Sequence, residues 1–380
     1  MKKIRLFTPG PVMIPEDTML EMARPIDHHR TAAFRESFKE LGSLLQYVFQ
    51  TSGTCVTITG SGTAAAEAAI VGCCPPGHKA LVGLNGKFAE RWAKVCTNFG
   101  IPHTAMPVEW GTGVKAADVE AQFKADPRLD TVIIVHSETS TTALSDVAAI
   151  AKVTRAHNAI LIVDGITAVG AIPVKMDEWG VDVYITGSQK ALMLPPGLGF
   201  LAVNDRAWQR IDSGKTTTLY NDLKAYRKSL EKNDVPYTPA NTLILGAVHN
   251  LRKIKERGLE NIWKETALFA RATRAAVAAL GLKTYAKDPT DSVTGIWVPQ
   301  GVDEAKLRKT LRGDFGQQWA GGQGDLEGKI VRITHMGYMD IFDTLGGIAA
   351  LELALRKNGY NTPIGAGVSA AQKVFAEALG

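Results

Sequence analysis

Two polar residues with complementary chemistry follow two consecutive apolar runs in the middle of the chain. The run AILIVD ends in Asp164, and the run DVYITGSQK leads through Gly187 and Ser188 to Gln189 and Lys190. The carboxyl ends of parallel strands meet at one crevice, where open sheets bind their ligands. A lysine in such a crevice can condense with a carbonyl group to form a Schiff base. An acid beside it can keep a ring nitrogen protonated.

This pairing is typical of enzymes that use pyridoxal phosphate (PLP). Their lysine carries the cofactor, and their aspartate holds the pyridinium proton that makes the ring an electron sink. Each residue also has a structural interpretation, since an aspartate after a strand often caps a helix or forms a turn, and a lysine there is often solvated. The occurrence of Asp164 and Lys190 on consecutive expected strands favours the catalytic interpretation.

A glycine-rich turn earlier in the chain could bind a phosphate group. In TITGSGTAAAEAAI an expected strand ends at Thr59, and Gly60 to Thr63 open an alanine-rich helix. Backbone N–H groups and the helix dipole attract anions at such a turn, and Ser61 and Thr63 add hydroxyl groups. The same sequence also suits a tight strand–helix turn, so this segment alone leaves both interpretations open.

Two further segments could contact a planar cofactor. Phe88 in LNGKFAERW could cover a ring, or it could pack in the core. In VIIVHSETSTTAL, Glu138, Thr139 and Ser140 leave an expected strand where hydroxyl donors could meet a ring oxygen. A turn closed by a serine or threonine side chain is the structural alternative there.

A single arginine in an apolar setting suggests a carboxylate site. Arg332 lies in IVRITHMGY, within a short expected strand. Arginine binds carboxylates through two parallel hydrogen bonds and stays charged when buried. A structural salt bridge to an acid is the rival interpretation. His335, three residues on, could face the same cleft, or it could be a core histidine.

These residues need a sheet to position them, and the apolar runs supply one. Continuous apolar runs suit parallel strands that are covered on both faces. Helical stretches lie between the runs, such as 62–72, 87–98 and 146–157, and this alternation predicts an α/β domain with a mostly parallel sheet. The expected strands are Val56–Thr59, Ala80–Gly83, Thr131–His136, Ala159–Asp164, Val181–Thr186 and Leu198–Val203.

The pattern changes after about residue 245. Long helices are expected at 245–257 and 259–280, short strands near 292–298 and 330–333, and closing helices at 341–358 and 368–379. This arrangement predicts a smaller α+β domain. We therefore divide the chain into an N-terminal segment at 1–19 that packs near the active site, a large domain at 20–255 and a small domain at 256–380.

Composition excludes several classes of protein. The 380 residues are 45% hydrophobic and 21% charged, which indicates a globular fold rather than disorder. The net charge of +5 comes with no Lys/Arg block, so we expect no nucleic-acid partner. No apolar run approaches the ~20 residues of a membrane helix, and the start does not resemble a signal peptide. The four cysteines lack CxxC spacing, so we expect no metal site and a cytoplasmic location.

Over nearly its full length the chain resembles class V (fold type I) PLP-dependent aminotransferases. It is most similar to the alanine–glyoxylate, serine–pyruvate and serine–glyoxylate group. The segments that carry the resemblance are TPGPVMIP at 8–15, TGSGTAAAE, VDGITAVG, GSQKAL, PPGLGF and RITHMGY. The resemblance implies a fold type I PLP-transferase, and a homodimer with active sites at the subunit interface.

The resemblance also implies roles for individual residues. Lys190 would carry the cofactor and shuttle the α-proton, Asp164 would pair with the pyridine nitrogen, and Arg332 would hold the substrate carboxylate. Thr139 would lie near both the ring hydroxyl and the substrate. Thr238, or alternatively Tyr237, would reach the phosphate of the neighbouring subunit. The remaining cofactor-binding positions would be Ser61, Gly62, Thr63, Phe88, Ile166 and Gln189.

The function implied is transfer of an amino group from alanine or serine to glyoxylate or pyruvate by a ping-pong mechanism. A 2-aminoethylphosphonate–pyruvate transaminase and a non-catalytic subunit of a larger complex are the alternatives. Cysteine desulfurase chemistry is disfavoured, because no cysteine follows Cys96, and Gln189 and Phe88 stand where desulfurases tend to carry histidine. The sequence leaves the substrate pair and the roles of His28 and Arg30 open.

Overall fold

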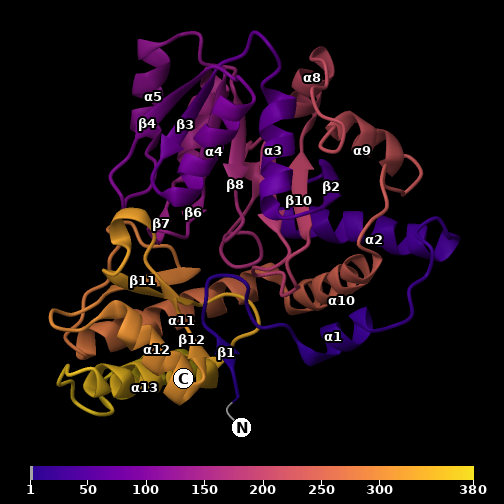
Figure 1. Ribbon diagram of the computed structural model, residues 1–380. Helices are drawn as coiled ribbons and strands as arrows, with labels where there is room; N and C mark the ends of the chain where they lie inside the picture. The colour runs from indigo at the N-terminus through magenta and orange to yellow at the C-terminus, as the bar shows by residue number, and fades with distance from the viewer. Residues whose placement is uncertain (1–2) are drawn as a thin grey trace.

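A computed structural model describes residues 3–380, with a seven-stranded sheet at its centre (Figure 1). The first two residues of the expected N-terminal segment lie outside this range. The strand order is β2-β10-β9-β8-β5-β3-β4. The strands are β2 (Thr54–Thr59), β3 (Ala80–Leu84), β4 (His103–Pro107), β5 (Thr131–Val135), β8 (Ile160–Asp164), β9 (Val183–Gly187) and β10 (Leu198–Val203).

The expectation of a mostly parallel sheet is confirmed. Four of the six pairings are parallel, and β10 runs antiparallel between β2 and β9. Every second residue of β8 faces the same side: Ile160 and Ile162 join one apolar core, and Leu161 and Val163 join the other. Burial on both faces explains why the strands appear in the sequence as continuous apolar runs.

Helices cover both faces of this sheet. Buried side chains of α3, α4, α8 and α9 pack on one face, and those of α2, α5, α6 and α10 pack on the other. No helix in residues 3–380 is long and apolar enough to cross a membrane. These helices are α2 (Ala32–Phe49), α3 (Gly62–Cys73), α4 (Lys87–Asn98), α5 (Ala116–Ala125), α6 (Val147–Ala156), α8 (Asp205–Ser213), α9 (Leu223–Leu230) and α10 (Asn241–Arg257).

The C-terminal part forms a smaller α+β unit, drawn in orange and yellow beneath the large sheet in Figure 1. Its antiparallel sheet has the order β11-β14-β13. The division of the chain at residues 19 and 255 remains a prediction. The elements of the unit are α11 (Leu259–Ala279), β11 (Val293–Trp297), α12 (Glu304–Phe315), β12 (Gln317–Gln318), β13 (Ala320–Gly321), the 3-10 turn η1 (Gly324–Leu326), β14 (Ile330–Thr334), α13 (Ile341–Lys357) and α14 (Ala366–Leu379).

The N-terminal segment connects the two units. Strand β1 (Arg5–Leu6) pairs with β12, and Phe7 is buried in the core of the small unit. Five residues later, Val12 is buried in a core of the large sheet, and its N–H donates to the carbonyl of Gln189 at 3.2 Å. The remaining short elements are α1 (Glu16–Met22), β6 (Ser137–Glu138), β7 (Ala143–Leu144) and α7 (Met176–Trp179).

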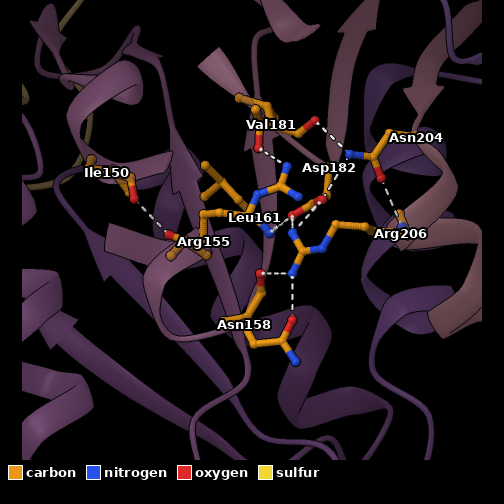
Figure 2. A network of polar contacts seen from close by, with 12 residues as sticks. Ile150, Arg155, Asn158, Leu161, Val181, Asp182, Asn204 and Arg206 are labelled. Atoms are coloured by element: carbon orange, nitrogen blue, oxygen red, sulfur yellow. Dashed lines mark hydrogen bonds and ion pairs between the residues drawn. The ribbon is translucent and has the colours of Figure 1, made fainter. Parts of the chain in front are cut away.

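A buried aspartate, Asp182, stabilises the end of the sheet at which strands β8 and β9 begin (Figure 2). The carboxylate of Asp182 accepts hydrogen bonds from Leu161 N, Asn204 Nδ2 and Arg206 Nη1, each at 2.9 Å. Arg206 also donates to the carbonyl of Ala159 at 3.2 Å. Asp164 lies at the opposite, C-terminal end of β8, so this network stabilises the fold without contacting the candidate site.

Candidate active site

Lys190 lies in the loop after β9, buried beneath the N-terminal segment. Its Nζ donates a hydrogen bond to the carbonyl of Pro9 at 2.6 Å. A Cβ atom added to Gly10 would lie 2.2 Å from Nζ, so any side chain at position 10 would collide with the amine. Burial lowers the pKa of Lys190 to about 8, because the ammonium form loses its hydration. A neutral amine, which is the reactive form, is therefore accessible near physiological pH.

Asp164 ends β8 and is also buried. Trp92 Nε1 donates to its Oδ2 at 3.0 Å, and Ile166 N donates to its Oδ1 at 2.9 Å. Burial raises the pKa of Asp164 to about 7, against the opposing effect of these hydrogen bonds and of the Lys190 charge. Asp164 takes part in no ion pair within residues 3–380. A cationic group placed beside it would therefore restore its ionised form.

The glycine-rich turn lies next to both residues. Ser61 caps α3, with its Oγ accepting from Thr63 N at 3.3 Å. A Cβ atom added to Gly62 would lie 2.7 Å from Ile166 Cδ1, so the helix start packs directly against the loop after Asp164. The hydroxyl of Thr63 accepts a hydrogen bond from Arg91 Nη1 at 3.2 Å. The turn thus brings the start of a helix, two hydroxyl groups and a cation together.

Gln189 is close to the same turn. A Cβ atom added to Gly187 would lie 3.0 Å from Gln189 Oε1 and 3.5 Å from Gly62 N. Oε1 of Gln189 is buried without a hydrogen-bond partner in residues 3–380. Since the two ends of a glutamine amide can be exchanged by a 180° flip, Gln189 can present either its oxygen as an acceptor or its NH₂ group as a donor to a ligand.

Arg332 on β14 is buried where the small unit meets the loop after β5. Its Nη1 donates to the carbonyl of Thr139 at 2.7 Å, and its Nε donates to the carbonyl of Gly321 at 2.8 Å. Burial lowers the pKa of Arg332 to about 10, which leaves it charged at neutral pH. Arg332 forms no ion pair within residues 3–380, so the structural salt bridge considered from the sequence is wrong.

The loop that carries Thr139 is held by hydroxyl groups. Thr139 Oγ1 lies 3.1 Å from Thr167 Oγ1, and Thr167 Oγ1 donates to the carbonyl of Ser137 at 2.7 Å. Phe88 is half-buried at the start of α4, and the guanidinium carbon of Arg91 lies 5.0 Å from its ring centre. Phe88 packs against the core on one face of the sheet and stays partly exposed, so its contact with a cofactor ring remains a prediction.

Tyr237 and Thr238 lie near the start of the glycine-rich turn of their own chain. Tyr237 stacks on Tyr220 with ring centres 5.1 Å apart, and the Tyr220 hydroxyl donates to the carbonyl of Thr59 at 2.7 Å. Thr238 is exposed. The contact of either residue with a neighbouring subunit stays a prediction.

The structure also places His335, Arg30 and His28, whose roles the sequence left open. His335 is buried, and its Nε2 lies 2.8 Å from Thr294 Oγ1, as expected of a core histidine. Burial lowers the pKa of His335 to about 3. Arg30 is exposed and pairs with Asp234 at 3.3 Å, and His28 is exposed beside it.

Three site residues were not identified as such from the sequence. Trp92 and Arg91 follow Phe88 by four and three residues, so the helical spacing from Phe88 was the available signal. Glu138 was named only with its loop. Its contact with Ala89 joins two segments that are 49 residues apart in the sequence, and no local sequence pattern indicates that these segments meet.

Comparison with known proteins identifies the family. A family model described as aminotransferase class-V matches residues 20–316. The "soluble hydrogenase 42 kDa subunit" of Anabaena cylindrica is 38% identical, covering 98% of this chain and 99% of that protein. The serine–glyoxylate aminotransferase of Methylorubrum extorquens is 37% identical, with 98% and 96% covered. The crystal structure of ureidoglycine–glyoxylate aminotransferase from Bacillus subtilis has a TM-score of 0.93 at 28% identity, and 99% of each chain is covered.

The chain therefore belongs to the class V aminotransferase family. It is an aminotransferase with the fold type I architecture, and its cofactor is pyridoxal phosphate. The residues present fit that cofactor. Asp164 is a buried carboxyl group without a cation, which suits a pyridinium nitrogen, and the turn at Ser61–Thr63 offers N–H groups and hydroxyls to a phosphate.

Proposed function

We propose that this aminotransferase moves an amino group from a small amino acid, such as serine or alanine, to glyoxylate or pyruvate. The observation that carries the proposal is the arrangement of Lys190, Asp164 and Arg332. An amine with a lowered pKa, an acid without a cation and a guanidinium without an anion lie within electrostatic reach of one another. Each lacks the partner that a cofactor or a carboxylate substrate would supply.

Each residue then has a defined task. When bound, PLP supplies the sink for the electron pair released at the substrate α-carbon. Asp164 keeps the proton on the pyridine nitrogen. With the cofactor bound, the Nζ atom of Lys190 would take the proton from the substrate α-carbon and release it to a second carbon, a task suited to an amine whose pKa is about 8. The Pro9 carbonyl orients Nζ while it is free.

Arg332 sets the substrate class. Amino acids and 2-oxo acids share an α-carboxylate, which a guanidinium binds through a fork of two hydrogen bonds. Two of its N–H groups already donate to carbonyls, so its direction is fixed before substrate arrives. Donor and acceptor would use this one clamp in turn, which supports a ping-pong mechanism.

We also propose a cytoplasmic homodimer with Thr238 or Tyr237 reaching the partner's phosphate site. Helix α1 and the segment after it expose the apolar residues Met19, Leu20 and Ile26 to solvent, which supports a covering partner. The four cysteines are unbridged and buried, which supports a reducing compartment. Burial raises the pKa of Cys74 and Cys96 to about 12, so none of these thiols resembles an activated nucleophile.

The name of the Anabaena relative supports a second candidate, a non-catalytic subunit of a larger complex. One experiment separates the two. The purified protein is titrated with PLP and then assayed with a matrix of amino donors against glyoxylate and pyruvate. A visible absorption band that borohydride removes, together with turnover of at least one pair, supports the enzyme. A 2-aminoethylphosphonate donor in the same matrix tests the phosphonate alternative. A protein that binds no PLP and transfers no amino group refutes the proposal.

A further inference from the structure

Glu138 is a fully buried acid beside the candidate site, and three hydrogen-bond donors converge on it. Ala89 N donates to its Oε2 at 3.0 Å. Ser140 N and Ser140 Oγ donate to its Oε1 at 2.9 and 2.6 Å. Burial raises the pKa of Glu138, and these three hydrogen bonds oppose that shift because each of them favours the ionised form.

These bonds join two walls of the site. The start of α4, with Phe88, lies on one side, and the loop with Thr139 lies on the other. Lys87 N donates to Ser140 Oγ at 2.9 Å, and Thr141 Oγ1 donates to the carbonyl of Asn85 at 3.0 Å. A Cβ atom added to Gly86 would lie 2.4 Å from Glu138 Cγ, so the two segments are in close contact around this side chain.

The charge of Glu138 also acts on Arg332. After burial, Glu138 has the largest effect on the pKa of Arg332, and it favours the charged form. The other two charges that act on Arg332 belong to Glu304 and Arg308, which pair with each other. Glu138 does not pair with Arg332 directly, because the Thr139 carbonyl receives the guanidinium N–H group.

We propose that Glu138 is a positioning residue for both the cofactor and the substrate carboxylate, an inference that rests on the proposed function. It holds the walls that carry Phe88 and Thr139 together. Its negative charge also favours the charged form of Arg332 without a direct ion pair. The guanidinium therefore remains free to bind the substrate carboxylate.

The test compares Glu138→Gln with a matched control, Glu352→Gln. Glu352 is also buried and also accepts backbone N–H groups, from Gly365 at 2.7 Å and Val368 at 3.0 Å, but it lies in the small unit away from the site. Glutamine at position 138 would turn its NH₂ group against either Ala89 N–H or Ser140 N–H. We expect PLP to bind about tenfold more weakly and KM for glyoxylate to rise about tenfold, with a smaller change in kcat.

Three measurements decide the matter: the PLP dissociation constant by absorbance titration, the split between KM and kcat, and the melting temperature. Glu352→Gln should lower the melting temperature alone. Equal effects of the two variants on PLP affinity and on KM would overturn the inference. If Glu138→Gln fails to fold, Ser140→Ala replaces it, since that variant removes one donor to Glu138; an unchanged PLP affinity in Ser140→Ala would also overturn it. Failure of the wild-type protein to bind PLP would refute the proposed function instead.

Discussion

The lowered pKa of Lys190 predicts the pH dependence of cofactor attachment. Only the neutral amine attacks a carbonyl group. With a pKa of about 8 the neutral fraction at pH 7 is about 9%, whereas an ordinary lysine with a pKa near 10.5 would be about 0.03% neutral. Burial therefore raises the neutral fraction of the amine about 300-fold at pH 7, and raising the pH above about 9 should add little to the rate of attachment.

The assay mixes cofactor-free protein with PLP between pH 6 and 10.5. Attachment is trapped with borohydride at successive times and counted by mass spectrometry. The same series with a free lysine derivative gives the pH dependence of PLP itself, and Lys190→Ala should show no attachment at this position. A rate that climbs steadily to pH 10.5, parallel to the free lysine derivative, would refute the argument that burial beneath Pro9 and Gly10 activates this amine.

Three other substitutions test separate parts of the structure. Asp164→Asn should abolish the loss of stability that the cofactor-free wild-type protein shows between pH 5 and pH 8, because the raised pKa of Asp164 makes its stability contribution fall as pH rises from about 4 to 7; calorimetry of both proteins at the two pH values checks this, and PLP affinity should drop. Arg332→Lys should raise KM about tenfold for donor and acceptor alike, and a change in only one would place the other carboxylate elsewhere. Asp182→Ala should cost about 2–3 kcal/mol in urea unfolding while PLP affinity stays unchanged; weaker PLP binding would show that the two edges of the sheet are coupled.

The strands that carry the chemistry could be predicted because they are buried on both faces. Expected and observed ends of Leu198–Val203 agree, and Asp164 ends β8 as expected. The edge strand β4 was not among the expected strands, because His103–Pro107 (HTAMP) is short and only Met106 in it is buried. An edge strand with one exposed side lacks the apolar run that identified the others.

The contacts of the site were harder to foresee than its members. The sequence indicated Arg332 but left its partner open, since an arginine in an apolar strand suits a salt bridge and a substrate clamp equally. Only the packing of the small unit on the Thr139 loop decides that its bonds go to carbonyls. The Trp92 contact with Asp164 likewise depends on the rotation of α4, which sequence spacing alone does not fix.

The N-terminal segment places a strict limit on its own length. Phe7 is held in the core of the small unit and Val12 in a core of the large sheet, and the Pro9 carbonyl between them meets the reactive amine. A residue inserted or deleted between positions 7 and 12 would have to displace one of these three contacts. In a library of single-codon insertions and deletions selected for activity, variants with a length change between positions 7 and 12 should therefore be rare. Variants with a length change at the exposed turn around Gly301 should be recovered.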